Sequence, residues 1–332
     1  MKLELGIVRV FAAAAVAAFF MAGAAGARAD DAVVLQLDWL PVGLHMAPYA
    51  GLMEGYFKDE HIDLDVRRGS GAADSLTKVA TGTAQFGYTD IANVMSTPGT
   101  GVKAIMSIDF EVPHAVIARA DTGIKSFADL PGHSVGTAPT ASSNLYFPLV
   151  LKDAGVDISK IDIINVDPSA LPAMLITKRV DSVMMWTTNL PRLEPEAKKA
   201  GIGLVPLPFN IVNRDMYGTV IIASDKTLAT EPELTRRFLR ALRRSFLYLR
   251  DHPDQTAAYV KTLVPQQDEA IEAAGLKEGM KHVFTWEDDE HTFGRFDPHK
   301  VKTTYSWIVR AMHADPSVDP ETFIDRRFFV AG

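Results

Sequence analysis

The chain contains no cysteine among its 332 residues. This absence excludes disulfide bonds, a lipid-modified N-terminal cysteine, a thiolate nucleophile and any cysteine-ligated metal centre. A protein without disulfide bonds has to derive its stability from apolar packing instead. A chain of this length is large enough to form two domains with substantial cores.

Long apolar runs are also scarce, because the sequence has only one, within its first 29 residues. Lys2 and Arg9 accompany an almost entirely apolar stretch at 10–25, and Ala27-Arg28-Ala29 places small residues at the two positions that a signal peptidase reads. This pattern predicts a secretory signal peptide at 1–29 that is cleaved after its last alanine. A membrane anchor is the alternative, but the run is short and interrupted by glycine. We therefore expect a soluble mature chain.

Strong net charge is missing as well. The formal charge is -7, and it would become -9 without the signal peptide, which carries two net positive charges. A mildly acidic chain argues against a nucleic-acid partner. The arginine-rich face of the helix expected at 231–250 is accordingly interpreted as solvent-exposed, although such a face also has the chemistry to contact nucleic acid or a membrane.

Sequence signals for enzymatic chemistry are few. The chain has no His-Glu-x-x-His motif and no phosphate-binding lysine loop. Asp38 and His45 are a candidate acid–base pair, but a single histidine near an apolar helix face more often packs or contacts a ligand. The acidic run at 287–291 is a poor metal site, because neighbouring side chains in a run rarely point together. We expect no catalytic residue, no cofactor and no metal ion.

The segment from 33 to 68 predicts a strand–helix–strand unit. An alternating apolar run ends at Asp38-Trp39-Leu40-Pro41, a helical pattern follows at 46–57, and a second alternating run occupies 62–66. Such units build parallel sheets whose ligands bind at the carboxyl ends of the strands. Trp39 is therefore expected beside a bound molecule.

The rest of the sequence predicts a continued alternation of strands and helices. Strands are expected at 84–90, 102–108, 113–119, 134–136, 161–166, 180–186 and 216–223. Helices are expected at 75–81, 144–154, 171–177, 231–250, 268–283 and 298–314. Two sets of strand–helix repeats, linked by two buried runs and by no flexible linker, indicate two lobes in close contact.

Short motifs follow one another along nearly the whole mature chain. They are LDWLP (37–41), GYFK (55–58), GSG (69–71), GTAQFG (82–87), IKSFADLPG (124–132), AGVD (154–157), VDSV (180–183) and RFLRA (237–241). In this order and spacing they resemble the periplasmic solute-binding proteins of ABC importers, in the nitrate/sulfonate/taurine and thiamine-precursor group.

The resemblance implies an α/β fold of the two-lobe, type II periplasmic binding protein kind. Each lobe would be a mixed sheet with flanking helices, and two crossover strands, here 113–119 and 217–223, would join the lobes. Lobe one would comprise 30–118 and 222–332, and lobe two would comprise 119–221. The resemblance further implies a small-molecule ligand held between lobes that close on it, a transient ABC permease partner, and a monomer in the periplasm.

Within that group, Trp39 and His45 resemble the branch that binds pyrimidine-like heteroaromatic compounds, and Trp39 would stack on a planar ring. Leu190 stands where members of that branch carry a glutamate. A small organic anion such as a sulfonate is the alternative ligand, bound by the donors of the loop at 140–143. The same fold also hosts pyrimidine-synthesising and menaquinone-pathway enzymes and ligand sensors, which stay open as alternatives.

The expected ligand-binding residues lie near strand ends of both lobes. They are Asp38, Trp39, His45, Gly71, Asp90 and Asn93 from lobe one, and Thr140, Ser142, Ser143, Trp186 and Asn189 from lobe two.

Overall fold

The computed structural model describes residues 29–108, 113–209, 216–263, 265, 268–284, 291–312 and 314–330. The predicted signal peptide up to residue 28 and the acidic run at 287–290 lie outside the described residues. In the part of the chain that is described, no helix has both the length and the apolar character needed to cross a membrane.

The first sheet has the strand order β2-β1-β3-β10-β4. Its strands are β1 (Asp31–Gln36), β2 (Ile62–Arg67), β3 (Phe86–Asp90), β4 (Val102–Ser107) and β10 (Thr219–Ser224). β1 pairs in parallel with β2 and β3, whereas β10 runs antiparallel to β3 and β4. The strand β10 therefore belongs to this sheet although it is separated from β4 by more than a hundred residues.

The second sheet has the order β7-β6-β8-β5-β9. Its strands are β5 (His114–Arg119), β6 (Ser134–Thr137), β7 (Asp162–Asn165), β8 (Ser182–Trp186) and β9 (Leu204–Pro208). β6 is parallel to β7 and β8, and β5 is antiparallel to β8 and β9. Pro206 and Pro208 are compatible with β9 because this strand lies at an edge of the sheet.

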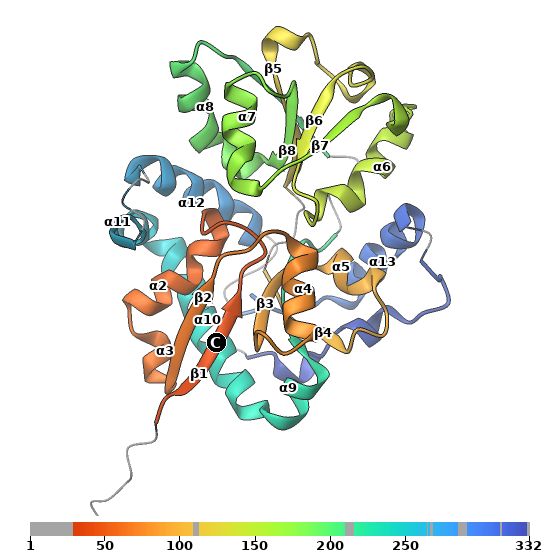
Figure 1. The fold of residues 1–332 in the computed structure, drawn as a ribbon. Helices are drawn as coiled ribbons and strands as arrows, with labels where there is room; N and C mark the ends of the chain where they lie inside the picture. The colour runs from red at the N-terminus through yellow and green to blue at the C-terminus, as the bar shows by residue number, and fades with distance from the viewer. Residues whose placement is uncertain are drawn as a thin grey trace, which may run out of the picture.

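Helices flank both sheets and give the molecule two lobes (Figure 1). Around the first sheet lie α2 (Ala47–Met53), α3 (Tyr56–Asp59), α4 (Ala72–Ala80), α5 (Ile91–Ser96), α9 (Asp225–Thr230), α10 (Pro232–Asp251), α11 (Pro253–Leu263), α12 (Glu269–Val283) and α13 (Pro298–Met312). Around the second lie α6 (Ser143–Asp153), α7 (Leu171–Ile176) and α8 (Leu190–Lys199). The predicted class, two mixed sheets with flanking helices, is confirmed.

The chain passes from the first sheet to the second between β4 and β5, and it returns between β9 and β10. β5 pairs only with strands of the second sheet and β10 only with strands of the first, among the described strands. These pairings place the change of lobe just before β5 and just before β10. The exact division into lobes at 118/119 and 221/222 stays a proposal.

The helix predicted at 46–57 is interrupted in the structure. Gly55 adopts a left-handed conformation with φ 73°, which separates α2 from α3. Glycine reaches this region without the steric penalty that a Cβ atom brings. Phe57 of α3 still points into the core, as the helical pattern predicts.

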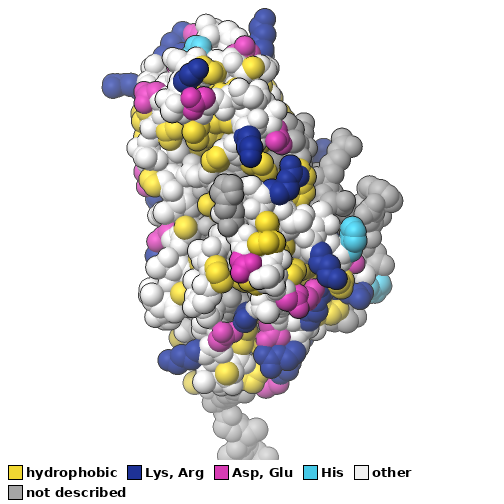
Figure 2. All heavy atoms as spheres, turned by 90° about the vertical axis from the view of Figure 1, so that its right-hand side faces the viewer, with side chains coloured by type: hydrophobic (Ala, Val, Ile, Leu, Met, Phe, Trp, Pro, Cys, Tyr) yellow, Lys and Arg dark blue, Asp and Glu magenta, His cyan; other side chains and the backbone are white. Residues whose placement is uncertain are grey.

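The long helix α10 packs one face on the first sheet and pairs its other face with acidic residues. Phe238 stacks on Phe86 of β3, with ring centroids 4.0 Å apart. On the opposite side, Arg240 donates two hydrogen bonds to the Glu60 carboxylate, at 2.9 and 2.8 Å. The basic face of this helix is thus partly neutralised within its own lobe. Figure 2 likewise shows basic and acidic side chains interspersed over the surface in view.

Candidate functional site

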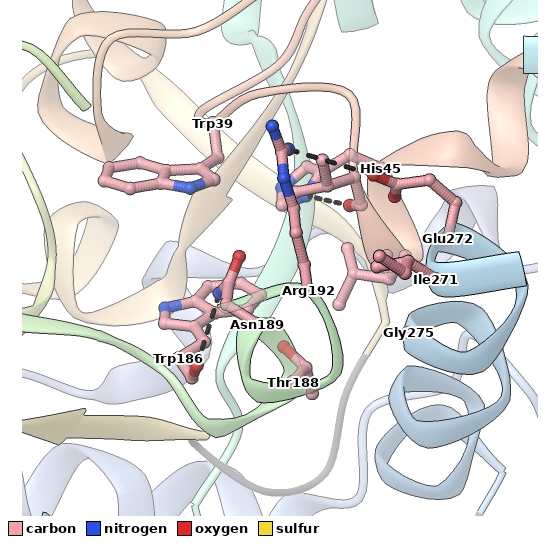
Figure 3. Close-up of a pocket in the computed structure, with 12 residues that line it drawn as sticks. Trp39, His45, Trp186, Thr188, Asn189, Arg192, Ile271, Glu272 and Gly275 are labelled. Carbon is pink, nitrogen blue, oxygen red and sulfur yellow. Dashed lines mark hydrogen bonds and ion pairs between the residues drawn. The ribbon is translucent and has the colours of Figure 1, made fainter. Parts of the chain in front are cut away.

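Two tryptophans from opposite lobes define the centre of the site. Trp39 follows β1 of the first sheet, and Trp186 ends β8 of the second. Each half-buried indole packs against an apolar cluster of the other lobe. In Figure 3 the two indoles lie one above the other, with side chains of both lobes around them. Each lobe therefore contributes one indole to the contact between the lobes.

Both indoles line two neighbouring pockets, each with residues from both lobes. The serine pocket holds about 310 Å³ of empty space, part of it open to solvent, between Asp38, Trp39, Ala72, Ala141, Ser142, Ser143, Met184, Met185 and Trp186. The α12 pocket has about 400 Å³ of empty space, again partly open to solvent. It is lined by Trp39, Val42, Gly43, Leu44, His45, Trp186, Thr188, Asn189, Arg192, Ile271, Glu272 and Gly275. Small polar groups next to flat apolar faces are typical of small-molecule sites.

Asp38 and His45 form a buried pair beside Trp39. The Nε2 atom of His45 lies 2.6 Å from Asp38 Oδ1, and its Nδ1 atom lies 3.2 Å from the Val42 carbonyl oxygen. Both ring nitrogens thus lie within hydrogen-bonding distance of an oxygen atom, so the position of the ring is fixed on both sides. The His45 ring also lies near the rings of Tyr88 and Trp186, with centroid distances of 5.4 and 5.7 Å. This pair fixes the wall of the site next to both indoles.

A second buried network joins the lobes behind the serine pocket. His114, the first residue of β5, lies within 3.3 Å of Asp90 Oδ2 and of Ser142 Oγ, and 3.0 Å from Ser143 Oγ. Asp90 also accepts a hydrogen bond from the Tyr146 hydroxyl at 2.7 Å and caps α5 through the Ala92 N–H. Because Asp90 belongs to the first sheet and the other side chains to the second, this network connects the lobes at the start of β5.

The loop between β2 and α4 touches the other lobe directly. The Thr140 hydroxyl donates to the Ser70 carbonyl at 2.9 Å, and the Ala73 N–H donates to the Thr140 carbonyl at 3.2 Å. Gly71 has φ 150°, and a Cβ atom there would lie 2.5 Å from the Thr140 carbonyl carbon and oxygen. A glycine is therefore required for this approach of the two lobes.

The eleven predicted site residues fall into three groups in the structure. Asp38, Trp39, His45, Ser142, Ser143, Trp186 and Asn189 line one or both pockets. Gly71 and Thr140 instead make the contact between the lobes, and Asp90 anchors the His114 network. Asn93 is buried and lines neither pocket, and its Nδ2 atom has no hydrogen-bond partner among the described residues. Their roles toward a ligand stay predictions.

Residues of α8 and α12 were missed by the analysis of the sequence. Arg192 and Glu272 line the α12 pocket, and their closest charged atoms are 3.8 Å apart across the two lobes. Burial raises the pKa of Glu272, with nearby Asp268 and Glu196 acting in the same direction and Arg192 opposing them. The sequence prediction considered residues near strand ends, whereas Arg192 and Glu272 lie within helices. No signal in the sequence indicated that these helices reach the site.

One stretch does match the Gly-x-Ser-x-Gly pattern of serine hydrolases, namely residues 132–136. Its Ser134 opens β6, and the Ser134 hydroxyl donates to Asp181 Oδ2 at 3.1 Å while accepting from the Asp181 N–H at 2.9 Å. A nucleophile elbow instead places the serine on a sharp turn between a strand and a helix. Ser134 therefore serves the structure of the sheet. In the described parts of the chain, no group of three acidic or histidine side chains is arranged to bind a metal.

Comparison with known families gives a match over more than half of the chain. The sequence pattern of the family described as NMT1/THI5 like covers residues 43–256.

Curated relatives include binding proteins and an enzyme. A Brucella abortus protein whose name describes a binding protein is 23% identical over 214 residues, which are 63% of this chain and 65% of that protein. The chain thus spans about 65% of the length of the first such relatives. A formylaminopyrimidine-binding protein of Halalkalibacterium halodurans is 22% identical over 85% of this chain and 86% of its own. A 4-amino-5-hydroxymethyl-2-methylpyrimidine phosphate synthase of Legionella pneumophila is 22% identical over 70% of this chain and 74% of its own.

Solved structures share the fold at low sequence identity. A Candida albicans gene product, described as having the generic periplasmic binding protein fold, aligns with a TM-score of 0.68 and 13% identity over 89% of this chain and 96% of that one. The periplasmic aliphatic sulphonate binding protein SsuA of Escherichia coli aligns with a TM-score of 0.64 and 15% identity, over 92% and 95%. The chain therefore belongs to the NMT1/THI5-like family and has the two-lobed fold of the periplasmic binding proteins.

Proposed function

We propose that the protein is the extracytoplasmic solute-binding component of an ABC importer and that it binds a small planar heteroaromatic compound between its lobes. The observation that carries this proposal is the pair of indoles, Trp39 and Trp186, which come from opposite lobes and line the same two pockets. An aromatic ring between two indoles gains stacking contacts on both faces. Such a ring would also link the two lobes and so favour their closure.

The charges around the indoles favour a neutral or cationic ring over an anion. The charged side chain lining the serine pocket is Asp38, and the Arg192 guanidinium of the α12 pocket lies beside the Glu272 carboxylate. Carboxylates at these positions repel a sulfonate. The formylaminopyrimidine-binding relative supports the heteroaromatic class, and the likeness to SsuA keeps a sulfonate as the second candidate.

Binding, rather than catalysis, fits the buried groups. Asp38 and His45 bond to each other, and His114 bonds to Asp90 and to two serines, so these groups are engaged within the fold. The synthase among the relatives makes a pyrimidine-forming enzyme the alternative function, and a ligand sensor would use the same pockets. We further propose that the protein is exported to the periplasm and that its signal peptide is cleaved after Ala29. It would act there as a monomer, with an ABC permease as its partner.

A ligand screen tests the proposal. The protein without its first 29 residues is heated with pyrimidines, pyridines, alkanesulfonates and nitrate, and hits are titrated by calorimetry. A ligand at one hundred times its dissociation constant stabilises the native state by about 2.7 kcal/mol, which shifts the melting temperature measurably. We expect heteroaromatic hits and a smaller radius of gyration on binding. Stabilisation by sulfonates alone would exclude the heteroaromatic class, and turnover of a hit would exclude a binding protein.

A further inference from the structure

His114 carries a buried imidazole ring whose nitrogen atoms lie beside side chains of both lobes. The residue is 1% exposed. Its Nδ1 atom lies 3.0 Å from Ser143 Oγ, and its Nε2 atom lies 3.3 Å from both Ser142 Oγ and Asp90 Oδ2. Aromatic rings pack around the imidazole, namely those of Tyr146, Trp186 and Phe209. In the described part of the chain, two hydroxyl groups and one carboxylate therefore decide which ring nitrogen carries the proton.

Of these three partners, the carboxylate is the one with a single role. A hydroxyl group can donate or accept a hydrogen bond, whereas a carboxylate only accepts. The Asp90 Oδ1 atom already accepts from the Tyr146 hydroxyl and from the Ala92 N–H, and Oδ2 is the oxygen beside the ring. A proton on Nε2 is attracted by Oδ2, whereas a lone pair there would be repelled. In a neutral ring with this proton, Nδ1 is the acceptor and the Ser143 hydroxyl is its donor.

This tautomer would fix what the two hydroxyl groups offer to the serine pocket, which both serines line. Ser143 uses its hydroxyl proton in the bond to Nδ1, so its lone pairs are left for the pocket. Ser142 accepts from the Nε2–H, which it shares with Asp90, so its own proton is left for the pocket. A hydroxyl group that is oriented in advance needs no reorientation when a ligand binds, and such preorganisation favours affinity.

We propose that His114 is a positioning residue of the ligand site: Asp90 selects its Nε2–H tautomer, and this tautomer sets the direction of the Ser142 and Ser143 hydroxyl groups. Asp90 ends β3 of the first sheet, whereas His114 and the serines belong to the second lobe. The tautomer is therefore fixed when the lobes meet, and both tautomers become available when Asp90 moves away from the ring. The inference rests on the proposed function, because it takes the serine pocket to be part of the ligand site.

NMR of the mature protein with 15N-labelled histidine tests the tautomer without any ligand, because the nitrogen chemical shift distinguishes a protonated ring nitrogen from an unprotonated one. His114→Phe identifies the signals, and at mildly basic pH we expect a protonated Nε2 and an unprotonated Nδ1. Asp90→Asn should exchange these two states. The Tyr146 hydroxyl and the Ala92 N–H would hold the amide oxygen in the place of Oδ1, so the amide nitrogen would donate to Nε2. Any other state of the ring in the wild type, or the same tautomer in both proteins, would overturn the proposal.

Titration with pyrimidine, whose ring nitrogens only accept hydrogen bonds, then locates the donor in the pocket. In the wild-type background we expect Ser142→Ala to weaken pyrimidine binding about two- to tenfold more than Ser143→Ala does, which is the effect of one hydrogen bond. In the Asp90→Asn background the order of the two serine variants should be reversed. Serine effects that Asp90→Asn leaves unchanged would overturn the link from His114 to the pocket. Failure of pyrimidine to bind would count against the proposed function, whereas the spectra would still decide the tautomer.

Discussion

Gly71 of one lobe lies against Thr140 of the other so closely that any side chain on Gly71 would overlap the threonine. We therefore expect Gly71→Ala to oppose closure of the lobes. If the substitution makes the free energy of lobe closure less favourable by about 1.4 kcal/mol, ligand affinity falls tenfold. Calorimetry with a hit from the ligand screen measures the loss, and small-angle scattering should show a larger radius for the variant.

The control for this prediction is Gly82→Ala. Gly82 also has a positive φ of 75°, but a Cβ atom there would meet nothing within 4 Å. Both variants carry backbone strain, and only the first brings a collision between lobes. Equal affinities of the two variants would show that the contact of Gly71 with Thr140 is unimportant for binding.

Trp39→Ala should weaken binding more than it weakens the fold. The indole is half-buried and packs on the opposite lobe, so its removal leaves the core of its own lobe intact. Loss of a stacking platform costs about 1–3 kcal/mol of binding free energy, whereas loss of a core aromatic costs about 3–5 kcal/mol of stability. Titration and thermal unfolding of the same sample separate these outcomes. Unchanged affinity together with a large drop in melting temperature would assign Trp39 to the core.

Asp90→Ala is expected to destabilise the protein strongly. The change removes the cap of α5 and the buried carboxylate that accepts the hydrogen bond of the Tyr146 hydroxyl and lies beside the His114 ring. The two losses together amount to about 2–4 kcal/mol of unfolding free energy. Urea denaturation provides the measurement. Asp268→Ala is the control, because Asp268 caps α12 at an exposed position, and about 1 kcal/mol is expected there. Similar losses in the two variants would contradict the structural role of the network.

Glu272 predicts a specific pH dependence of stability. Burial raises the pKa of Glu272 in the folded protein above the ordinary value of 4.5, which applies in the unfolded chain. At a pH between the unfolded and the folded pKa, the folded state therefore holds more protons than the unfolded state. The contribution of Glu272 to stability therefore falls as the pH rises through this window. Glu272→Gln should be more stable than the wild type at pH 7 and should lose that advantage at pH 4. Parallel stability curves of the two proteins would show that this carboxyl group is not perturbed.

Much of the fold could be predicted because its signals are local. The alternation at 62–66 and the amphipathic pattern at 231–250 correspond to β2 and α10. The prolines at 191 and 195 concealed α8, since proline usually marks the end of a helix. Pro206 and Pro208 concealed β9 in the same way, because an edge strand tolerates residues that a central strand excludes.

The candidate site was harder to predict because it depends on how the lobes meet. Trp39 and Trp186 were found as residues at strand ends, where α/β proteins bind ligands. Glu272 and Arg192 lie on helices that approach each other only when the lobes pack, and no pattern within either helix records that contact. Thr140 was identified for its hydroxyl group, but the structure uses that group to hold the Gly71 loop.

The contact between the loop of Gly71 and Thr140 also offers a place to observe the protein at work. Ser70 exposes its side chain at this junction while its carbonyl accepts the bond from Thr140. Since the chain has no cysteine of its own, Ser70→Cys would carry the single thiol of the molecule. A fluorescent dye attached there would change its surroundings whenever the lobes part or meet, which would make the protein an optical reporter of its own ligand.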